Sequence, residues 1–271
     1  MHDYSTELAF ALDVARRGGR VAMSHFGRNP EARQKDDGSW VTEADWAVES
    51  QIRLRIARTF PDHNILGEEE GLTAAGGGEP HPEAPTWIVD PIDGTNNYMR
   101  GIPIWATLVA LRVGEESVVG VAHAPALDET YDAAVQLGAR MNGQTIEVDR
   151  TESLSEAMFV FADAQSFVKY GIGDVFDELR ERTYRNRGFG DFWGHMLVAR
   201  GAAHVMIEPS LKLWDVAALQ PIVTEAGGSI SRLDGNPWVD AGGCVTTNGV
   251  LHQEVVTLLA ERGDLREKGA R

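Results

Sequence analysis

The feature that most constrains this chain is an apolar strand that leads into two acidic residues. The stretch WIVDPIDGTNNY, residues 87–98, runs from three apolar residues into Asp90 and Asp93, with a proline between them. Two carboxylates three residues apart repel each other unless they are protonated or bridged by a cation. Carboxylate oxygens suit Mg²⁺, which takes one or two of them beside waters and substrate phosphate. The sequence therefore predicts a strand that delivers acidic side chains to a metal site.

Two further carboxylates stand at the end or start of an apolar element. Glu68 follows the apolar run of NILGEEEGL, and Asp215 heads a helical segment in LKLWDVAAL. Each has an ordinary structural explanation, because Glu68 fits a solvated acidic turn and Asp215 fits a helix cap. Together with Asp90 and Asp93, however, they share a position where binding sites are usually assembled. We expect these four side chains to converge on one pocket.

The residues after Asp93 favour a phosphate contact. Gly94 would let the backbone approach a ligand closely, and a short helix starting at Thr95 would point its first N–H groups outward. The same run also fits a plain turn followed by a helix cap. Upstream, Thr42 and Asp45 fit a capping box, and Asp45 could in addition orient Thr95 toward a water.

Hydrophobic periodicity predicts the elements of the first half of the chain. Residues 5–26 favour a helix that frays or kinks at Gly18-Gly19, and residues 44–60 favour an amphipathic helix. Residues 71–85 are rich in Gly, Ala and Pro and predict a mobile loop. Short strands close together in sequence then predict a largely antiparallel sheet. These strands are expected at residues 86–90, 106–114 and 117–125, with a hairpin around Asn142-Gly143.

The second half mixes helices and strands. Residues 189–208 favour a helix that feeds a strand, and residues 215–226 favour a helix that Pro221 weakens. Further strands are expected at residues 229–233 and 244–248, and a helix at 251–263. We predict two halves, residues 1–149 and residues 150–271, and an α/β (α+β) fold class in which layers of helix and sheet pack together.

Charge and cysteine content exclude several classes of partner. Asp and Glu outnumber Lys and Arg by 41 to 25, which gives a formal net charge of −16 and repels nucleic acid and anionic membranes. A phosphate-bearing ligand would need a cation to mediate its binding. No apolar run is long enough to span a bilayer, and Cys244 is the only cysteine, so neither a disulfide framework nor a thiolate metal site is expected. With no signal-peptide pattern at the start, we expect a cytoplasmic protein.

Other catalytic signatures are missing from the sequence. It contains no P-loop, no H-E-x-x-H zinc motif and no G-x-S-x-G elbow, and its eight histidines lack paired metal spacing. The sharpest rival is a phosphatase with an aspartyl-phosphate, whose motif is D-x-D-G-T. Here the run is D-P-I-D-G-T, and the extra residue disfavours a covalent Asp nucleophile.

These motifs in this order resemble the inositol monophosphatase superfamily over nearly the whole chain. The similar stretches are GEE at 67–69, WIVDPIDGTNNY at 87–98 and LWDVAALQPIVTEAGG at 213–228, with DDGSWVTEAD at 36–45 upstream. The resemblance implies a layered α-β-α-β-α sandwich, a homodimer, and Mg²⁺-dependent hydrolysis of a small phosphomonoester. It places the metal motifs in the N-terminal half and the specificity region in the C-terminal half.

The resemblance also implies residue roles. The family pattern assigns two or three Mg²⁺ ions to a metal-binding set, formed by Glu68, Asp90, the Ile92 carbonyl, Asp93 and Asp215. It assigns the positioning of the attacking water to Asp45 and Thr95, which together with Glu68 form the catalytic set. It assigns the substrate phosphate and its surroundings to an overlapping set, formed by Asp93, Gly94, Thr95 and Asp215.

Within the superfamily, residues 187–209 resemble actinobacterial-type histidinol-phosphate phosphatases more than the inositol enzymes. Asp191 and Glu208 would offer carboxylates to a substrate amine or imidazolium, which predicts L-histidinol phosphate, an intermediate of histidine biosynthesis, as substrate. Asp191 fits a helix cap equally well. Trp46, Trp193 and His195 have no role in this interpretation.

Two alternatives stay open. The first keeps the chemistry and changes the substrate to inositol-1-phosphate or another sugar or nucleotide phosphate. The second is a regulatory protein that retains the fold and contacts the transcription machinery. The acidic net charge and the complete set of metal ligands argue against this alternative.

Overall fold

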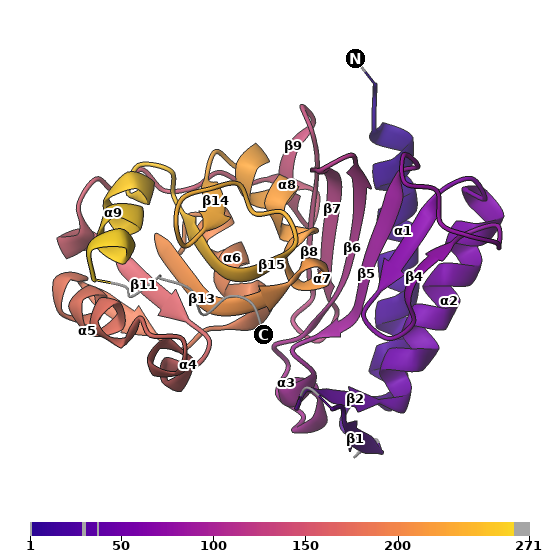
Figure 1. Ribbon diagram of the computed structural model, residues 1–271, viewed down its shortest axis with the longest axis horizontal. Coiled ribbons are helices and arrows are strands. Elements are labelled where there is room, and N and C mark those ends of the chain that lie inside the picture. The colour runs from indigo at the N-terminus through magenta and orange to yellow at the C-terminus, as the bar shows by residue number, and fades with distance from the viewer. Residues whose placement is uncertain (1, 29–30, 37, 263–271) are drawn as a thin grey trace. The chain divides into compact units, whose positions relative to one another are not determined.

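The computed structural model describes residues 2–28, 31–36 and 38–262, which form two compact units. The first unit holds the chain up to Gln144 together with Trp214–Ile222, and the second holds Thr145–Leu213 and the chain from Val223 on (Figure 1). The predicted division into residues 1–149 and 150–271 did not include this return of residues 214–222 to the first unit. Asp37 of the DDGSWVTEAD motif and Gly263, the last residue of the expected C-terminal helix, lie outside the described residues.

An eight-stranded sheet forms the centre of the first unit, with the strand order β10-β9-β8-β7-β6-β5-β3-β4. Its strands are β3 (Asn64–Gly67), β4 (Gly71–Ala74), β5 (Thr86–Asp93), β6 (Ala106–Val113), β7 (Glu116–Ala124), β8 (Glu129–Ala134), β9 (Gly138–Met141) and β10 (Gln144–Thr145). From β4 to β9 every pair is antiparallel except the parallel pair of β3 and β5, which confirms the predicted sheet. Asn142 and Gly143 both have positive φ, as the predicted hairpin turn requires.

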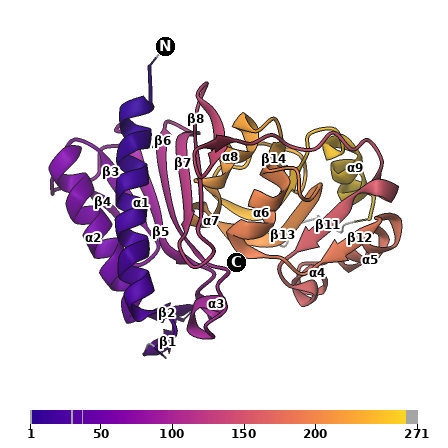
Figure 2. The same ribbon diagram turned by 180° about the vertical axis from the view of Figure 1, so that it is seen from behind.

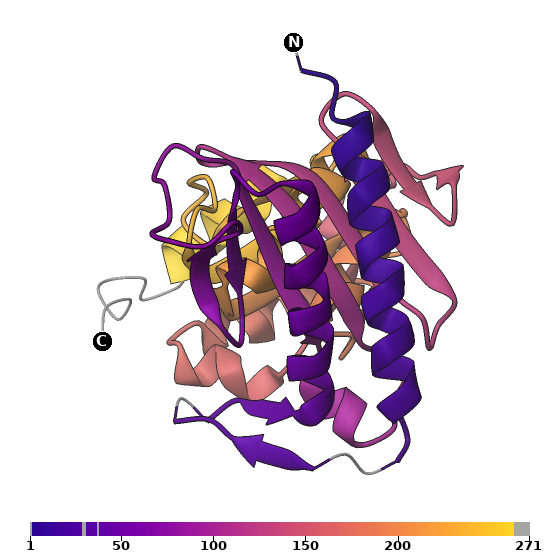
Figure 3. The ribbon, with the colours of Figure 1, turned by 90° about the vertical axis from the view of Figure 1, so that its right-hand side faces the viewer.

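Two helices, α1 (Ser5–His25) and α2 (Glu43–Thr59), cover one face of this sheet (Figure 3). Their apolar sides meet alternate strand residues such as Val109 and Leu111. The predicted kink of the first helix was wrong, since α1 runs without interruption through Gly18 and Gly19. Both glycines are buried, and a Cβ at Gly18 would lie 3.0 Å from the Val48 side chain, so they allow close packing.

The opposite face of the sheet receives the segment that returns from later in the chain. Instead of the predicted single helix over 215–226, the structure has α7 (Leu213–Val216) and α8 (Leu219–Glu225). Pro221 lies in the first turn of α8. Backbone N–H groups there have no acceptor within the helix, so the N–H that proline lacks costs no hydrogen bond. The segment is held to β7 by a hydrogen bond of 2.9 Å from Ser117 Oγ to Gln220 Oε1.

Short elements precede α2 and follow β3 and β5 in the first unit. A two-stranded hairpin, β1 (Ala32–Gln34) and β2 (Trp40–Thr42), lies just before α2 in the chain. The predicted loop over 71–85 begins as strand β4, because β3 offers it an antiparallel partner. The short helix expected at Thr95 is present as α3 (Thr95–Met99).

The second unit is built on a five-stranded sheet with the order β12-β11-β13-β15-β14. Its elements are η1 (Leu154–Glu156), β11 (Met158–Phe161), α4 (Ala164–Lys169), α5 (Gly173–Arg182), β12 (Arg185–Arg187), α6 (Asp191–Ala199), β13 (Val205–Lys212), β14 (Ser229–Arg232), β15 (Ala241–Thr247) and α9 (His252–Arg262). Side chains alternate between the two faces of β13, so the unit has a core on each face of its sheet. Val205 and Ile207 pack with α4, α5 and α9, whereas Met206 packs with α6. Figure 2 shows α6 lying over the sheet. The predicted helix and strand over 189–208 are confirmed as α6 and β13.

Burial of His123 predicts a pH dependence of stability. The His123 ring lies against α1, its Nδ1 is 2.9 Å from Thr130 Oγ1, and burial, with Arg16 and Arg20 nearby, lowers its pKa to about 4. As pH falls below the ordinary His pKa of about 6.5, the unfolded chain takes up a proton that the folded chain refuses, so stability is lost. We expect the free energy of unfolding to drop by about 2 kcal/mol from this residue between pH 7 and pH 5.

Urea unfolding at the two pH values measures this contribution. The His123→Gln variant, which keeps a polar side chain but cannot titrate in this range, should show a correspondingly smaller drop. Equal pH dependence in both proteins would contradict the assignment.

Candidate metal and phosphate site

A β-bulge brings Asp90 and Asp93 to the same side of β5. In a regular strand, residues three apart point to opposite faces. Here Asp90 pairs with Leu108 and Asp93 with Ala106, so β5 carries one residue more than β6 between these two pairs. A hydrogen bond of 2.9 Å from Thr107 Oγ1 to the Pro91 carbonyl holds the bulge in place. The extra residue of D-P-I-D-G-T therefore unites the two carboxylates.

Asp215 completes a compact acidic group with these two residues. One carboxylate oxygen from each of Asp90, Asp93 and Asp215 lies within 4.8 Å of the others, in a search limited to the described residues. Asp90 and Asp93 are buried, and Asp215, on α7, is half-buried. Burial, with the negative charges of Glu68, Asp93, Asp215 and Asp45, raises the pKa of Asp90 well above its usual range. Such a group is stable as three carboxylates only beside a cation.

Glu68 lies beside this group but is paired with a lysine. It follows β3, which runs parallel to β5, and among the neighbouring charges it contributes most to the raised pKa of Asp90. Its Oε1 is 2.8 Å from Lys35 Nζ, which also lies 2.7 Å from Glu69 Oε1. Burial alone would lower the pKa of Lys35, but its hydrogen bonds to Glu68 and Glu69 outweigh this and raise it. The structure thus supplies one cation of its own at the edge of the site.

Asp45 and Thr95, the two residues predicted to position a water, are each held by a local hydrogen bond. The predicted capping box is present, since Asp45 Oδ2 accepts hydrogen bonds from the Thr42 backbone N–H at 2.8 Å and hydroxyl at 2.6 Å. The second oxygen, Oδ1, is buried and has no partner among the described residues. Burial raises the pKa of Asp45 to about 7. The Thr95 hydroxyl donates to the Ile92 carbonyl at 3.1 Å, and Gly94 has a φ of 83°.

The donor set fits a hard divalent cation. Its side-chain groups are all carboxylates, the Ile92 carbonyl adds a neutral oxygen, and the unpartnered Asp45 oxygen leaves an acceptor for water. Oxygen-only donors with several negative charges are the ligands that Mg²⁺ prefers. The acidic group can therefore bind a metal ion.

The two predicted specificity residues belong to the second unit. Asp191 opens α6 with a φ of 53°, and the cap position before it is Gly190. Glu208, on β13, is buried and its Oε2 lies 2.9 Å from Nε2 of His195. The other ring nitrogen of His195 is 2.8 Å from Thr246 Oγ1. His195, for which the sequence suggested no role, thus links Glu208 to β15.

The two tryptophans without a predicted role differ in burial. Trp46, on α2, has 47% of its surface exposed, and Trp193, on α6, packs edge-on against the Phe189 ring at 5.2 Å between centroids. Neither observation indicates a function for the tryptophan concerned.

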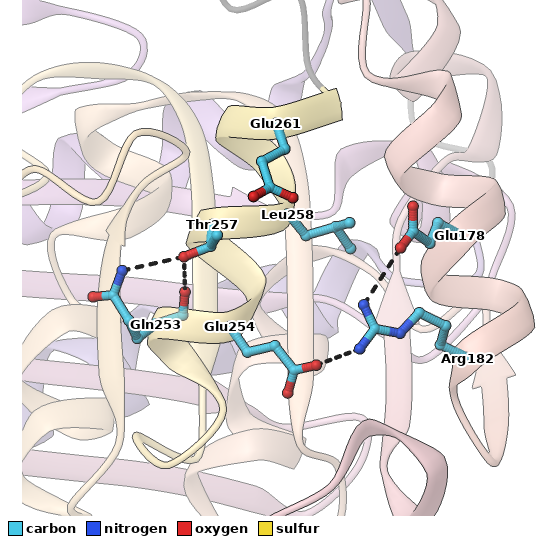
Figure 4. Close-up of a pocket in the computed structure, with 7 residues that line it drawn as sticks. All are labelled: Glu178, Arg182, Gln253, Glu254, Thr257, Leu258 and Glu261. Atoms are coloured by element: carbon cyan, nitrogen blue, oxygen red, sulfur yellow. Dashed lines mark hydrogen bonds and ion pairs between the residues drawn. The ribbon is translucent and has the colours of Figure 1, made fainter.

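A separate pocket between α5 and α9 has a volume of about 300 Å³ and lies wholly in the second unit (Figure 4). In Figure 4 the Arg182 guanidinium points between Glu178 and Glu254 and pairs with both. Its lining holds one arginine and three glutamates, so it is acidic, and no predicted site residue lines it.

Sequence reasoning missed Lys35, His195 and Glu49, whose carboxylate accepts hydrogen bonds from the backbone N–H groups of Glu69 and Glu70. Lys35 sits in a turn-rich stretch where nothing indicated a contact 33 residues away. His195 had a signal, because it is a polar residue inside the otherwise apolar helical run FWGHMLVA. Glu49 also had one, since Asp45, Glu49 and Arg53 repeat at every fourth position of α2.

No helix among residues 2–28, 31–36 and 38–262 is long and apolar enough to cross a membrane.

Comparisons with known proteins place the chain in a family. Residues 3–264 match the model of the inositol monophosphatase family. A histidinol-phosphatase of Streptomyces coelicolor is 37% identical over 97% of this chain and 100% of its own length. A histidinol-phosphatase of Mycobacterium tuberculosis is 38% identical over 93% of this chain and 97% of its own length.

A solved structure shows the same fold. The IMPase of Thermotoga maritima superposes with a TM-score of 0.84 at 32% identity, covering 94% of this chain and 97% of that chain. The predicted α/β fold of helix and sheet layers is thereby confirmed. With the family model matched from end to end and relatives above 30% identity over nearly their whole length, this chain belongs to the inositol monophosphatase family.

Proposed function

We propose that this phosphatase uses Mg²⁺ to hydrolyse a small phosphomonoester, and that the substrate is L-histidinol phosphate, which yields L-histidinol and phosphate. The observation that carries the proposal is the approach of Asp90, Asp93 and Asp215 to within 4.8 Å in a member of this family. A chain with a net charge of −16 needs a divalent ion to hold a phosphate there.

Five residues would hold two or three Mg²⁺ ions: Glu68, Asp90, Ile92 through its carbonyl, Asp93 and Asp215. When bound, Mg²⁺ supplies Lewis-acid chemistry, since it polarises phosphoryl oxygens and lowers the pKa of water. The burial of Asp90 and Asp93 supports strong interactions, because charges attract more strongly where water is excluded.

The remaining residues would orient the attacking water and the phosphate. Asp45 Oδ1, buried and without a partner among the described residues, can accept a hydrogen bond from water, while Asp45 Oδ2 is fixed by Thr42. The Thr95 hydroxyl, which donates to the Ile92 carbonyl, keeps its oxygen lone pairs available to the same water. Gly94 leaves the backbone open to the phosphate. Water attacks phosphorus in line with the leaving alcohol, and no covalent phosphoenzyme forms.

The histidinol part of the proposal rests on charge matching. The two relatives that are 37% and 38% identical are named histidinol-phosphatases. Asp191 and Glu208 would offer negative charge to the ammonium or imidazolium of histidinol, whereas inositol has no cation to meet them. Homodimer formation and a cytoplasmic location are further parts of the proposal.

A comparison of two substrates at saturating Mg²⁺ tests the assignment. We expect kcat/KM for histidinol phosphate to exceed that for inositol-1-phosphate by about 100-fold, because only histidinol carries cationic groups that the carboxylates of Asp191 and Glu208 can contact. A preference for inositol-1-phosphate would contradict the histidinol assignment and leave the phosphatase chemistry intact. Phosphate release from neither substrate would favour the regulatory alternative.

Replacing Asp191 by alanine should raise KM for histidinol phosphate by about 10-fold, since a charge-assisted contact is lost. KM for a neutral sugar phosphate should change far less. Asp174→Ala, at the exposed start of α5, is the matched control and should leave both values unchanged. Equal increases for both substrates would refute the substrate contact.

A further inference from the structure

A row of charged residues is buried along one side of α2. Asp45, Glu49 and Arg53 are spaced four residues apart, so they lie on the same side of the helix. The Glu49 side chain is 0% exposed and that of Arg53 is 9% exposed. Buried charges are stable only when hydrogen bonds and opposite charges satisfy them. The partners of this row therefore indicate what it is for.

Glu49 holds the backbone of the turn that carries Glu68. Its Oε2 accepts a hydrogen bond of 2.8 Å from the Glu69 N–H, and its Oε1 accepts one of 2.9 Å from the Glu70 N–H. Both carboxylate oxygens are thus committed to the two residues that follow Glu68. Because the chain is fixed on this side by Glu69 and on the other by β3, the direction of the Glu68 side chain is fixed as well.

Arg53 holds Glu49 and the far end of the same turn. Its Nε donates to Glu49 Oε1 at 2.8 Å, and its two terminal nitrogens donate to the Gly71 carbonyl at 2.6 Å and to Thr73 Oγ1 at 2.9 Å. The pair joins the end of β3 to the start of β4 through side chains of α2.

Gly67 is adapted to the Glu49 carboxylate. A Cβ at Gly67 would come closer than 3.0 Å to three atoms of that carboxylate group, which are its three nearest neighbours. Gly67 does not have a positive φ among the described backbone angles, so backbone conformation does not demand glycine here. Glycine at position 67 is explained by the approach of Glu49.

We propose that Glu49, supported by Arg53, is a positioning residue that orients Glu68 for metal binding. The inference rests on the proposed function to the extent that Glu68 is a metal ligand. Both carboxylate oxygens of Glu49 accept hydrogen bonds from backbone N–H groups, so its effect passes through the backbone of residues 67–70. Removing such an outer partner typically weakens metal binding by about 10- to 100-fold.

Calorimetric titration of the full chain with Mg²⁺ alone, without substrate, tests this role. Glu68→Gln identifies the binding that depends on Glu68. Glu49→Gln should raise the Kd of that same binding by about 10-fold or more, although the Glu68 side chain is still present. Glu43→Gln, an exposed residue in the first turn of the same helix, is the matched control and should bind as the unaltered protein does.

A second pair of variants keeps the test decisive if Glu49→Gln fails to fold. As a single substitution, Gly67→Ala displaces the Glu49 carboxylate, so it should weaken Mg²⁺ binding. The same change should have little further effect in a Glu49→Ala background, where space for the methyl group is open.

The outcomes separate the two proposals. Unchanged Mg²⁺ affinity in Glu49→Gln, or in Gly67→Ala when the first variant does not fold, overturns the positioning role. Mg²⁺ binding that is the same in the unaltered protein and in Glu68→Gln instead refutes Glu68 as a ligand, which is a failure of the proposed function.

Discussion

Asp93→Asn is expected to reduce kcat/KM by about 1,000-fold or more, because a metal ligand supplies several kcal/mol of charge stabilisation in the transition state. Asparagine keeps the shape of the side chain and removes its charge. In the absence of metal the variant should be at least as stable as the unaltered protein, since Asp93 is among the charges that raise the pKa of Asp90. Loss of activity without loss of stability is the expected signature.

Phosphate release and urea unfolding without divalent ions measure the two effects. Asp132→Asn is the matched control: Asp132 is a buried carboxylate of β8 whose pKa is raised by burial, and it is not part of the acidic group. It should retain activity. An active Asp93→Asn variant would count decisively against the metal site.

Gly120→Ala should reduce activity by about 100-fold, the loss expected when a catalytic group moves by about 1 Å. Gly120, on β7, faces the segment that carries Asp215. An added Cβ would approach the Ala218 carbonyl oxygen more closely than 3.0 Å and would lie 2.7 Å from Pro221 Cγ. Backbone cannot yield as a flexible side chain does, so residues 214–222 must shift and Asp215 must move away from Asp90 and Asp93.

The expected cost in stability is smaller, about 1 to 3 kcal/mol for an overpacked methyl group. Gly173→Ala is the matched control, because its Cβ would meet only Val168, at 3.3 Å from Cγ2, and the Val168 side chain is exposed. Activity close to that of the unaltered protein in a folded Gly120→Ala variant would show that Asp215 does not depend on this contact.

Local patterns were sufficient for most of the helices and strands. The four-residue spacing of Ala44, Val48, Ile52 and Ile56 predicted α2, because each of these side chains is buried on one side of the helix. Asn142-Gly143 predicted its turn because both positions require positive φ, which these residue types tolerate. Such features depend on neighbours in the sequence.

Errors arose where distant packing overrides local preference. Gly18 and Gly19 suggested a break in the first helix, but close approach to Val48 and His123 uses their missing side chains. Pro221 suggested a kink within one helix, but α8 starts just before it. In each case the sequence indicated an unusual residue, but only the contacts in the folded chain show what that residue does.

The acidic residues of the candidate site could be found from sequence, but their arrangement could not. Carboxylates at the ends of apolar elements marked Glu68, Asp90, Asp93 and Asp215. The bulge that unites Asp90 with Asp93 is set by pairing with β6, and the return of Asp215 is set by packing on β7. The roles assigned to these residues remain predictions that the variants test.

The most direct test of the central claim is phosphate release from histidinol phosphate as a function of Mg²⁺ concentration. We expect no release in a chelator, recovery as Mg²⁺ is added back, and no recovery in Asp93→Asn. Release at the same rate with and without divalent ions would contradict it.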